Sequence, residues 1–150
     1  HYFEEEAKKW LKEAINHNTP LCCALFDIDN FKEKNDQYGH IIGDQLLQQI
    51  GDVLKKFNYE NALFISRYGG DEFIIFSKNV ELFKQTIEDL VHTLHAIEIP
   101  YEDTYISFTI SLGAVVIEDL SDYTVSMIIQ KADEQLYKIK RSGKNNIKFA

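Results

Sequence analysis

The sequence has little of what membrane, secreted or nucleic-acid-binding proteins need. None of its 150 residues falls in an apolar stretch approaching the roughly 20 residues of a membrane-spanning helix, and no signal-peptide pattern is present. Sixteen basic residues against 24 acidic ones give a formal net charge of −8, which argues against binding to duplex DNA or an anionic membrane. We expect no nucleic-acid partner and no direct membrane contact, and any phosphate ligand should be small or bridged by metal.

Cysteine is scarce as well, because Cys22 and Cys23 are the only two in the chain. They are neighbours in an apolar run, and successive side chains of a strand point to opposite faces. We interpret them as small buried residues of a reduced, cytoplasmic protein rather than as a disulfide or a metal-binding pair.

Composition and periodicity predict one compact domain over residues 1–150. Hydrophobic residues make up 45% of the chain and aromatic residues 13%, which is enough for a sizeable core. Apolar residues at helical spacing predict helices over about 1–15, 42–57, 80–94 and 125–139, with Gly143 as the C-terminal cap of the last. Apolar and β-branched runs predict strands at 21–26, 62–68, 71–77, 105–117 and 146–149, with a bulge near Gly113.

The order of these elements predicts an α+β fold with a βαββαβ core and one extra helix in front. The helices are expected to cover one face of the sheet. The segment before residue 42, which carries Asn35, Asp36, Gly39 and His40, is expected to be a loop.

Acidic residues stand at two places that otherwise have the pattern of buried sheet. In the stretch SRYGGDEFIIF, residues 66–76, the two glycines suit a tight hairpin with positive φ, but Asp71 and Glu72 need another explanation. Asp27 and Asp29 follow the first strand. If that strand lies ~4.8 Å from the hairpin strand, Asp27 meets Asp71, and two such carboxylates require a proton or a cation between them.

A magnesium site is one explanation of this pattern. Carboxylates together with the backbone carbonyl of Ile28 form an all-oxygen donor set of the kind that Mg²⁺ prefers. Taken alone, each acidic pair also has an ordinary structural explanation, since an acid after a strand often forms a turn or a helix cap. Asp29 is interpreted as such a cap or as a supporting residue. The basic residues near the end of the last helix, likewise, are normal helix-dipole partners.

Four blocks of sequence together resemble the GGDEF domains, the diguanylate cyclases. They are FDIDNFKEKND at 26–36, YGHIIGD at 38–44, RYGGDEF at 67–73, and SLGA at 111–114 followed by the positions Ala132, Asp133, Leu136, Tyr137, Lys140 and SGKN at 142–145. The resemblance runs through the whole chain in the right order and spacing. It implies a palm-like sheet related to nucleotidyl cyclases, or ferredoxin-like, with a GGDEF hairpin, and a reaction that joins two GTP molecules into cyclic di-GMP with release of two pyrophosphates.

The resemblance also implies roles for individual residues. The metal ligands, for two Mg²⁺ (or Mn²⁺) ions in each active site, would be Asp27, the Ile28 carbonyl, Asp71 and Glu72. The catalytic residues would be Asp71 as the proton acceptor, Glu72, and Lys32 for phosphate contact or transition-state stabilisation. The substrate positions would be Phe31, Asn35, His40, Asp44, Gly69, Gly70, Lys140 and Lys144, with Asn35 and Asp44 accepting hydrogen bonds from the guanine edge.

Partners and regulation follow from the same resemblance. Because each domain would hold one GTP, the reaction is expected in a transient homodimer of GGDEF domains. We expect the chain to be part of a longer protein with an upstream sensor or regulatory domain. A membrane segment in that longer protein would anchor it to the membrane. The feedback site Arg-x-x-Asp of many relatives is replaced here by Glu60-Asn61-Ala62-Leu63, so product inhibition through it is not expected.

Two other functions fit the sequence. One is a catalytically silent GGDEF module that binds GTP or a partner protein and regulates an attached domain. The other is a different nucleotidyl cyclase or a synthase of hybrid dinucleotides.

Overall fold

The computed structural model describes residues 2–150, which form two sheets and five helices. The helices are α1 (Tyr2–Asn16), α2 (Phe31–Tyr38), α3 (His40–Asn61), α4 (Val80–His95) and α5 (Val125–Arg141). The strands are β1 (Leu21–Ile28), β2 (Phe64–Arg67), β3 (Glu72–Ser77), β4 (Glu98–Tyr101), β5 (Thr104–Ser107), β6 (Ile110–Ile117) and β7 (Ile147–Phe149). None of these helices is long and apolar enough to cross a bilayer.

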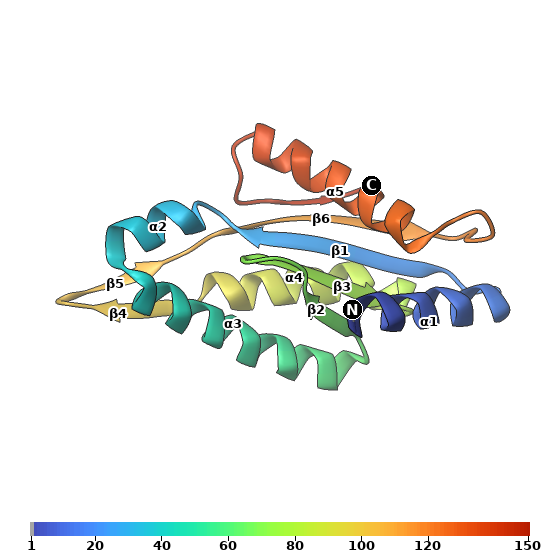
Figure 1. Cartoon of the computed structure of the whole chain (residues 1–150), viewed down its shortest axis with the longest axis horizontal. Coiled ribbons are helices and arrows are strands. Elements are labelled where there is room, and N and C mark those ends of the chain that lie inside the picture. Colours follow the sequence, from blue (N-terminus) through green and yellow to red (C-terminus); the bar gives the residue numbers. More distant parts are fainter. Residues whose placement is uncertain (1) are drawn as a thin grey trace.

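The main sheet has the strand order β2-β3-β1-β6-β7. All neighbouring strands are antiparallel except β6 and β7, which are parallel. The strands β4 and β5 form a separate two-stranded ribbon that extends from one end of the molecule (Figure 1). The central strand β1 is buried along its whole length, so its end is a rigid place from which to present a polar side chain.

Helices cover both faces of the main sheet, which corrects the expectation of a single covered face. One buried cluster packs α3 and α4 against Phe26, Phe73 and Leu112 of the sheet. A second cluster packs α1 and α5 against the opposite face, which includes Leu25 and Ile74. Because side chains alternate along a strand, β1 contributes to both clusters. Figure 1 shows α5 and α3 on opposite sides of β1 and β6.

The cysteines follow the same alternation. Cys22 belongs to the first cluster and Cys23 to the second, and both are buried and free. Burial raises the pKa of Cys22 to about 12, so the thiol stays protonated. The interpretation of both as small core residues is confirmed.

Three local expectations were wrong. The segment before residue 42 is not a loop, because residues 31–38 form α2; this helix buries none of its residues, so it leaves little apolar periodicity to detect. The expected strand at 105–117 is two strands, β5 and β6, separated at Phe108 and Thr109. The pairing of β1 with β6 continues without interruption from Leu21↔Ile117 to Ile28↔Ile110, so there is no bulge at Gly113.

Gly113 has a packing role instead. A Cβ atom at this position would lie 2.3 Å from the backbone nitrogen of Leu136 and 2.4 Å from the carbonyl oxygen of Ala132. Both atoms belong to the backbone of α5, so the glycine allows this helix to lie directly on β6. The predicted end of α5 is confirmed, because Gly143 has φ +117° immediately after the cap residue Ser142.

Replacing Gly113 with Ala should therefore destabilise the domain by about 1–3 kcal/mol, since α5 must move away from the sheet. Urea unfolding followed by circular dichroism measures this loss. The matched control is Gly51→Ala in α3, where a Cβ meets no atom within 4 Å and helix propensity favours alanine by up to about 1 kcal/mol. Equal stability of the two variants would contradict the close packing of α5 on β6.

Candidate active site

Two acidic segments that lie far apart in the sequence meet at one end of the main sheet. Asp27, near the end of β1, is the register partner of Glu72, the first residue of β3. The N–H of Ile28 donates to the carbonyl of Asp71 at 3.4 Å. In an antiparallel pair the N–H and C=O of one residue point to the same side, so the Ile28 carbonyl also faces the hairpin. The four positions predicted as metal ligands are thus neighbours.

A small cleft of about 200 Å³ opens beside these acids. Its walls come from the end of β1, the first turn of α2, the hairpin, and the end of α5 with the turn that follows. The predicted site residues that line it are Asp27, Ile28, Phe31, Lys32, Asp71, Lys140 and Lys144. The other predicted positions lie on the hairpin or around the junction of α2 and α3: Gly69, Gly70, Glu72, Asn35, His40 and Asp44.

Asp27 is a buried carboxylate with an incomplete set of partners. Its Oδ2 forms an ion pair with Lys140 of α5, whereas its Oδ1 is buried without a hydrogen-bond partner in residues 2–150. Burial raises the pKa of Asp27 and outweighs the lowering by Lys140, and the charges of Asp71 and Asp29 add to the rise. Because an unpaired buried oxygen of an acid is costly, this atom favours a cation or a donor.

Lys140 supplies the counter-charge in this structure. Burial lowers the pKa of its ammonium group, but the hydrogen bond and charge of Asp27, followed by the charges of Glu72 and Asp71, raise the pKa overall. The cleft is therefore an acidic site in which one lysine is held firmly protonated.

The donor set fits a divalent cation only as an open site. Within residues 2–150, no three side chains of His, Cys, Asp or Glu converge closely enough to bind an ion by themselves. Asp27, Asp71 and the Ile28 carbonyl offer oxygen atoms, which suit Mg²⁺, a cation that usually keeps several waters and takes phosphate oxygens of a substrate. The fit is to a metal whose coordination a phosphate ligand completes.

A second group of predicted residues surrounds the junction of α2 and α3. Asn35 has a buried Oδ1 without a hydrogen-bond partner in the described part of the chain. This oxygen lies over Gly43, where a Cβ atom would be only 1.9 Å from it. His40 and Asp44 are exposed and one helical turn apart, so they share a face of α3. Sequence reasoning missed Gly43, although it precedes Asp44 inside the motif at 38–44.

The hairpin glycines do not serve the turn in the expected way. Neither Gly69 nor Gly70 has a positive φ, which corrects that prediction. A Cβ at Gly69 would lie 3.0 Å from Glu72 Oε2, whereas at Gly70 it would meet no atom of the protein within 4 Å. The tip is held by Arg67, whose Nε and Nη2 donate to the Gly70 carbonyl at 2.9 and 2.5 Å. Sequence reasoning did not assign this role to Arg67.

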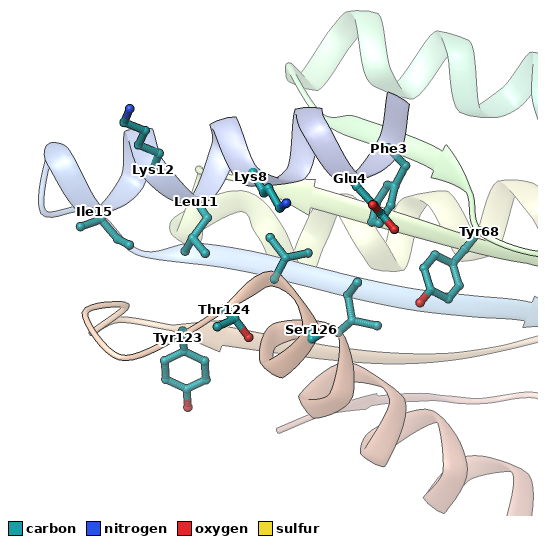
Figure 2. A pocket seen from close by; sticks show the side chains of 12 residues that line it. Phe3, Glu4, Lys8, Leu11, Lys12, Ile15, Tyr68, Tyr123, Thr124 and Ser126 are labelled. Atoms are coloured by element: carbon teal, nitrogen blue, oxygen red, sulfur yellow. The ribbon is translucent and has the colours of Figure 1, made fainter. Parts of the chain in front are cut away.

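A larger cleft, of about 760 Å³, lies between α1 and the start of α5 (Figure 2). Its lining is mostly apolar and includes Phe3, Leu11 and Ile129. It shares no residue with the acidic cleft and contains none of the predicted site residues. The larger cleft is therefore not the one in which the predicted site residues gather.

Comparison with known proteins agrees with the geometry. Residues 1–146 match the family model described as "Diguanylate cyclase, GGDEF domain". The chain is 33% identical over 150 residues to diguanylate cyclase DosC of Escherichia coli (strain K12), an alignment that covers 95% of this chain and 31% of DosC. The chain thus spans about a third of the length of that relative.

Solved structures show the same fold. The GGDEF domain of DgcB from Caulobacter crescentus in complex with c-di-GMP has a TM-score of 0.86 and 27% sequence identity, covering 98% of this chain and 85% of that one. The active GGEEF domain of a diguanylate cyclase from Vibrio cholerae has a TM-score of 0.83 and 28% identity, covering 97% and 92%. The predicted palm-like α+β fold is confirmed, and the chain belongs to the GGDEF domain family of diguanylate cyclases.

Proposed function

We propose that this domain is an active diguanylate cyclase, which condenses two GTP molecules into cyclic di-GMP and releases two pyrophosphates. The observation that carries the proposal is that Asp27, from β1, and Asp71, from the hairpin turn just before β3, line one cleft with Lys140 and Lys144. The acids would bind the metal and accept the proton of the attacking hydroxyl, and the lysines would contact the phosphates. The family and the relatives named above support the same activity.

The residues that would hold divalent metal are Asp27, Asp71, Glu72 and the carbonyl of Ile28. We propose Mg²⁺, or Mn²⁺ in its place, with two ions in each site. The unpartnered Oδ1 of Asp27 supports this choice, since a buried carboxylate oxygen favours a cation. When bound, the metal neutralises phosphate charge and makes the ribose hydroxyl more acidic.

The remaining chemistry belongs to side chains. The ribose 3′-oxygen of one GTP attacks the α-phosphorus of the other, the bond from that phosphorus to the pyrophosphate oxygen breaks, and the hydroxyl proton passes to Asp71. Lys32, Lys140 and Lys144 would balance the charge that develops on the phosphates. Lys140 would exchange its ion pair with Asp27 for a phosphate contact, and Phe31 would pack beside the nucleotide.

Guanine recognition is assigned to the junction of α2 and α3. The buried, unpartnered Oδ1 of Asn35 would accept a hydrogen bond from guanine, as would the carboxylate of Asp44, and His40 on the same face of α3 would contact the substrate. At Gly70, neither backbone φ nor packing against the protein requires a glycine. We therefore assign Gly70 to close approach of the hairpin backbone to the nucleotide, which a side chain would block. Gly69 would allow the same close approach.

The reaction needs two copies of the domain, because each active site would hold one GTP. We propose a transient homodimer in which two GTP-loaded domains face each other, controlled by a sensor or regulatory domain in a longer protein. The domain would work in the cytoplasm, where GTP is found, also when the full-length protein is attached to a membrane.

A silent GGDEF module is the second candidate, and one observation favours it. Lys140 already forms an ion pair with Asp27, one of the predicted metal ligands. Such a site would be able to bind GTP as a signal without turning it over.

Replacing Asp71 with Asn should lower the formation of cyclic di-GMP from GTP and Mg²⁺ by at least about 100-fold, because the proton acceptor is lost. Chromatography of the nucleotides together with a pyrophosphate assay measures this effect. Asp52→Asn, at an exposed position of α3, is the control and should retain full activity. A fully active Asp71→Asn variant refutes the assignment.

Replacing Asp44 with Ser should reduce discrimination between GTP and ATP by about tenfold or more, because a hydrogen-bond acceptor for guanine is removed. Competition experiments with mixed GTP and ATP measure the ratio and would also reveal a hybrid dinucleotide made by the unmodified domain. The Asp52→Ser variant should keep the original ratio. Unchanged discrimination in Asp44→Ser would count against its contact with guanine.

At low concentration, doubling the amount of domain should raise the rate about fourfold, since the active species is a dimer formed by mass action. Initial rates over a range of protein concentrations test this dependence. A rate that is simply proportional to concentration would argue against the dimer. Failure to form product at any concentration, with GTP still bound, would establish the silent module.

A further inference from the structure

Asp29 is the most completely hydrogen-bonded acid near the acidic cleft. It is about 5% exposed, and its carboxylate accepts from Thr109 Oγ1 and from Ser111 Oγ, each at 2.6 Å. It also accepts from the backbone N–H of Asn145 at 3.0 Å. Three donors to one carboxylate make a strong arrangement. Unlike Asp27, Asp29 has no unpartnered oxygen that calls for a cation.

These hydrogen bonds join three segments that are distant in sequence. Asp29 follows β1, Ser111 belongs to β6, and Asn145 lies in the turn between α5 and β7. The Ser111 hydroxyl also accepts from the Asn145 N–H at 3.1 Å. A single buried carboxylate thus ties the turn after α5 to the centre of the sheet.

That turn has an unusual backbone. Lys144 and Asn145, with φ of 65° and 49°, lie in the left-handed region directly after Gly143. For residues other than glycine this conformation is unfavourable, less so for asparagine than for lysine, so it persists where surrounding contacts hold it. The hydrogen bond from the Asn145 N–H to Asp29 is such a contact.

The same turn presents Lys144 to the acidic cleft. The ammonium group donates to Oδ1 of Asn30, the residue after Asp29, at 2.6 Å. The backbone beside Lys144 is held by the hydrogen bond from the Asn145 N–H to Asp29. Lys144 lines the cleft together with Asp27 and Asp71. Its position in the cleft therefore depends on the conformation that Asp29 maintains.

We propose that Asp29 is a positioning residue, which fixes the turn at 143–145 so that Lys144 meets the phosphate chain of the nucleotide. The proposal rests on the proposed function in taking a guanosine triphosphate as the ligand and Lys144 as a contact of its phosphates. Asp29 contacts neither metal nor substrate; it acts through Lys144. This role explains why an acid two residues after Asp27 has its full set of partners within the protein.

Binding measurements distinguish a positioning role of Asp29 from a role in the stability of the fold alone. The probe is a guanosine triphosphate with a methylene group between the α and β phosphorus atoms, which is bound with Mg²⁺ but cannot react; GMP serves as the comparison. Isothermal titration gives both dissociation constants for each variant, and thermal unfolding reports its stability.

Asp29→Asn should weaken binding of the triphosphate probe by about tenfold, the loss expected for one charge-assisted contact, and should leave GMP binding unchanged. In a Lys144→Ala background the same replacement should have no further effect, because the residue through which it acts is gone. Independent, multiplying losses in the double variant would overturn the proposal, as would equal losses for the probe and GMP.

Two further variants keep the test informative if Asp29→Asn fails to fold. Thr109→Val removes one donor to Asp29 without burying a new charge, and Asn30→Ala removes the contact to the Lys144 ammonium. Both variants should weaken binding of the triphosphate probe and leave binding of GMP unchanged. In the Lys144→Ala background, neither should weaken binding of the probe further. Asp119→Asn is the matched control, because this acid also accepts from a serine, Ser121, but is exposed and outside the cleft; it should bind the probe normally.

The outcome also distinguishes this proposal from the proposed function. If the unmodified domain binds the probe but makes no cyclic di-GMP from GTP, the cyclase assignment fails and the role of Asp29 is still decided by the binding data. If cyclic di-GMP is formed and the coupling between Asp29 and Lys144 is absent, the positioning role alone fails.

Discussion

The acidic cleft depends on the register between β1 and β3. Asp27 faces Glu72 because Phe26 pairs with Phe73 one position earlier, and those two rings stack with centroids 5.0 Å apart. A shift by one residue would send Asp27 to the opposite face, away from α5 and its lysine. The apolar residues of β1 thus fix where a buried carboxylate appears, one oxygen of which has no hydrogen-bond partner within residues 2–150.

Much of the fold follows from hydrophobic patterning, because the elements that pack on the sheet carry strong periodicity. A continuous apolar run such as 21–26 is typical of a strand covered on both sides, and the expectation of one covered face ignored that signal. Patterning could not reveal α2, which buries no residue. It also could not separate β5 from β6, since strand propensity continues through Phe108 and Thr109 while the chain changes partners.

The candidate site was predictable to the extent that its residues belong to recognisable motifs. Asp27 and Asp71 meet as the strand order implies, and Lys140 and Lys144 line the same cleft. Contacts between distant segments were not predictable, because no local pattern encodes them. The hydrogen bonds of Asp29 to Thr109, Ser111 and Asn145 are of this kind. The glycines were explained by turn geometry that the hairpin does not use.

The hydrogen bonds of Asp29 have a consequence for how the domain reaches its native state. They join residues separated by 80, 82 and 116 positions in the chain, and contacts of such long range form late because closing large loops is slow. During synthesis, the hairpin and α3 leave the ribosome well before the turn that carries Lys144. The end of the cleft that carries Lys144 is therefore assembled last, so a chain truncated after α5 would lack it even with the GGDEF hairpin intact.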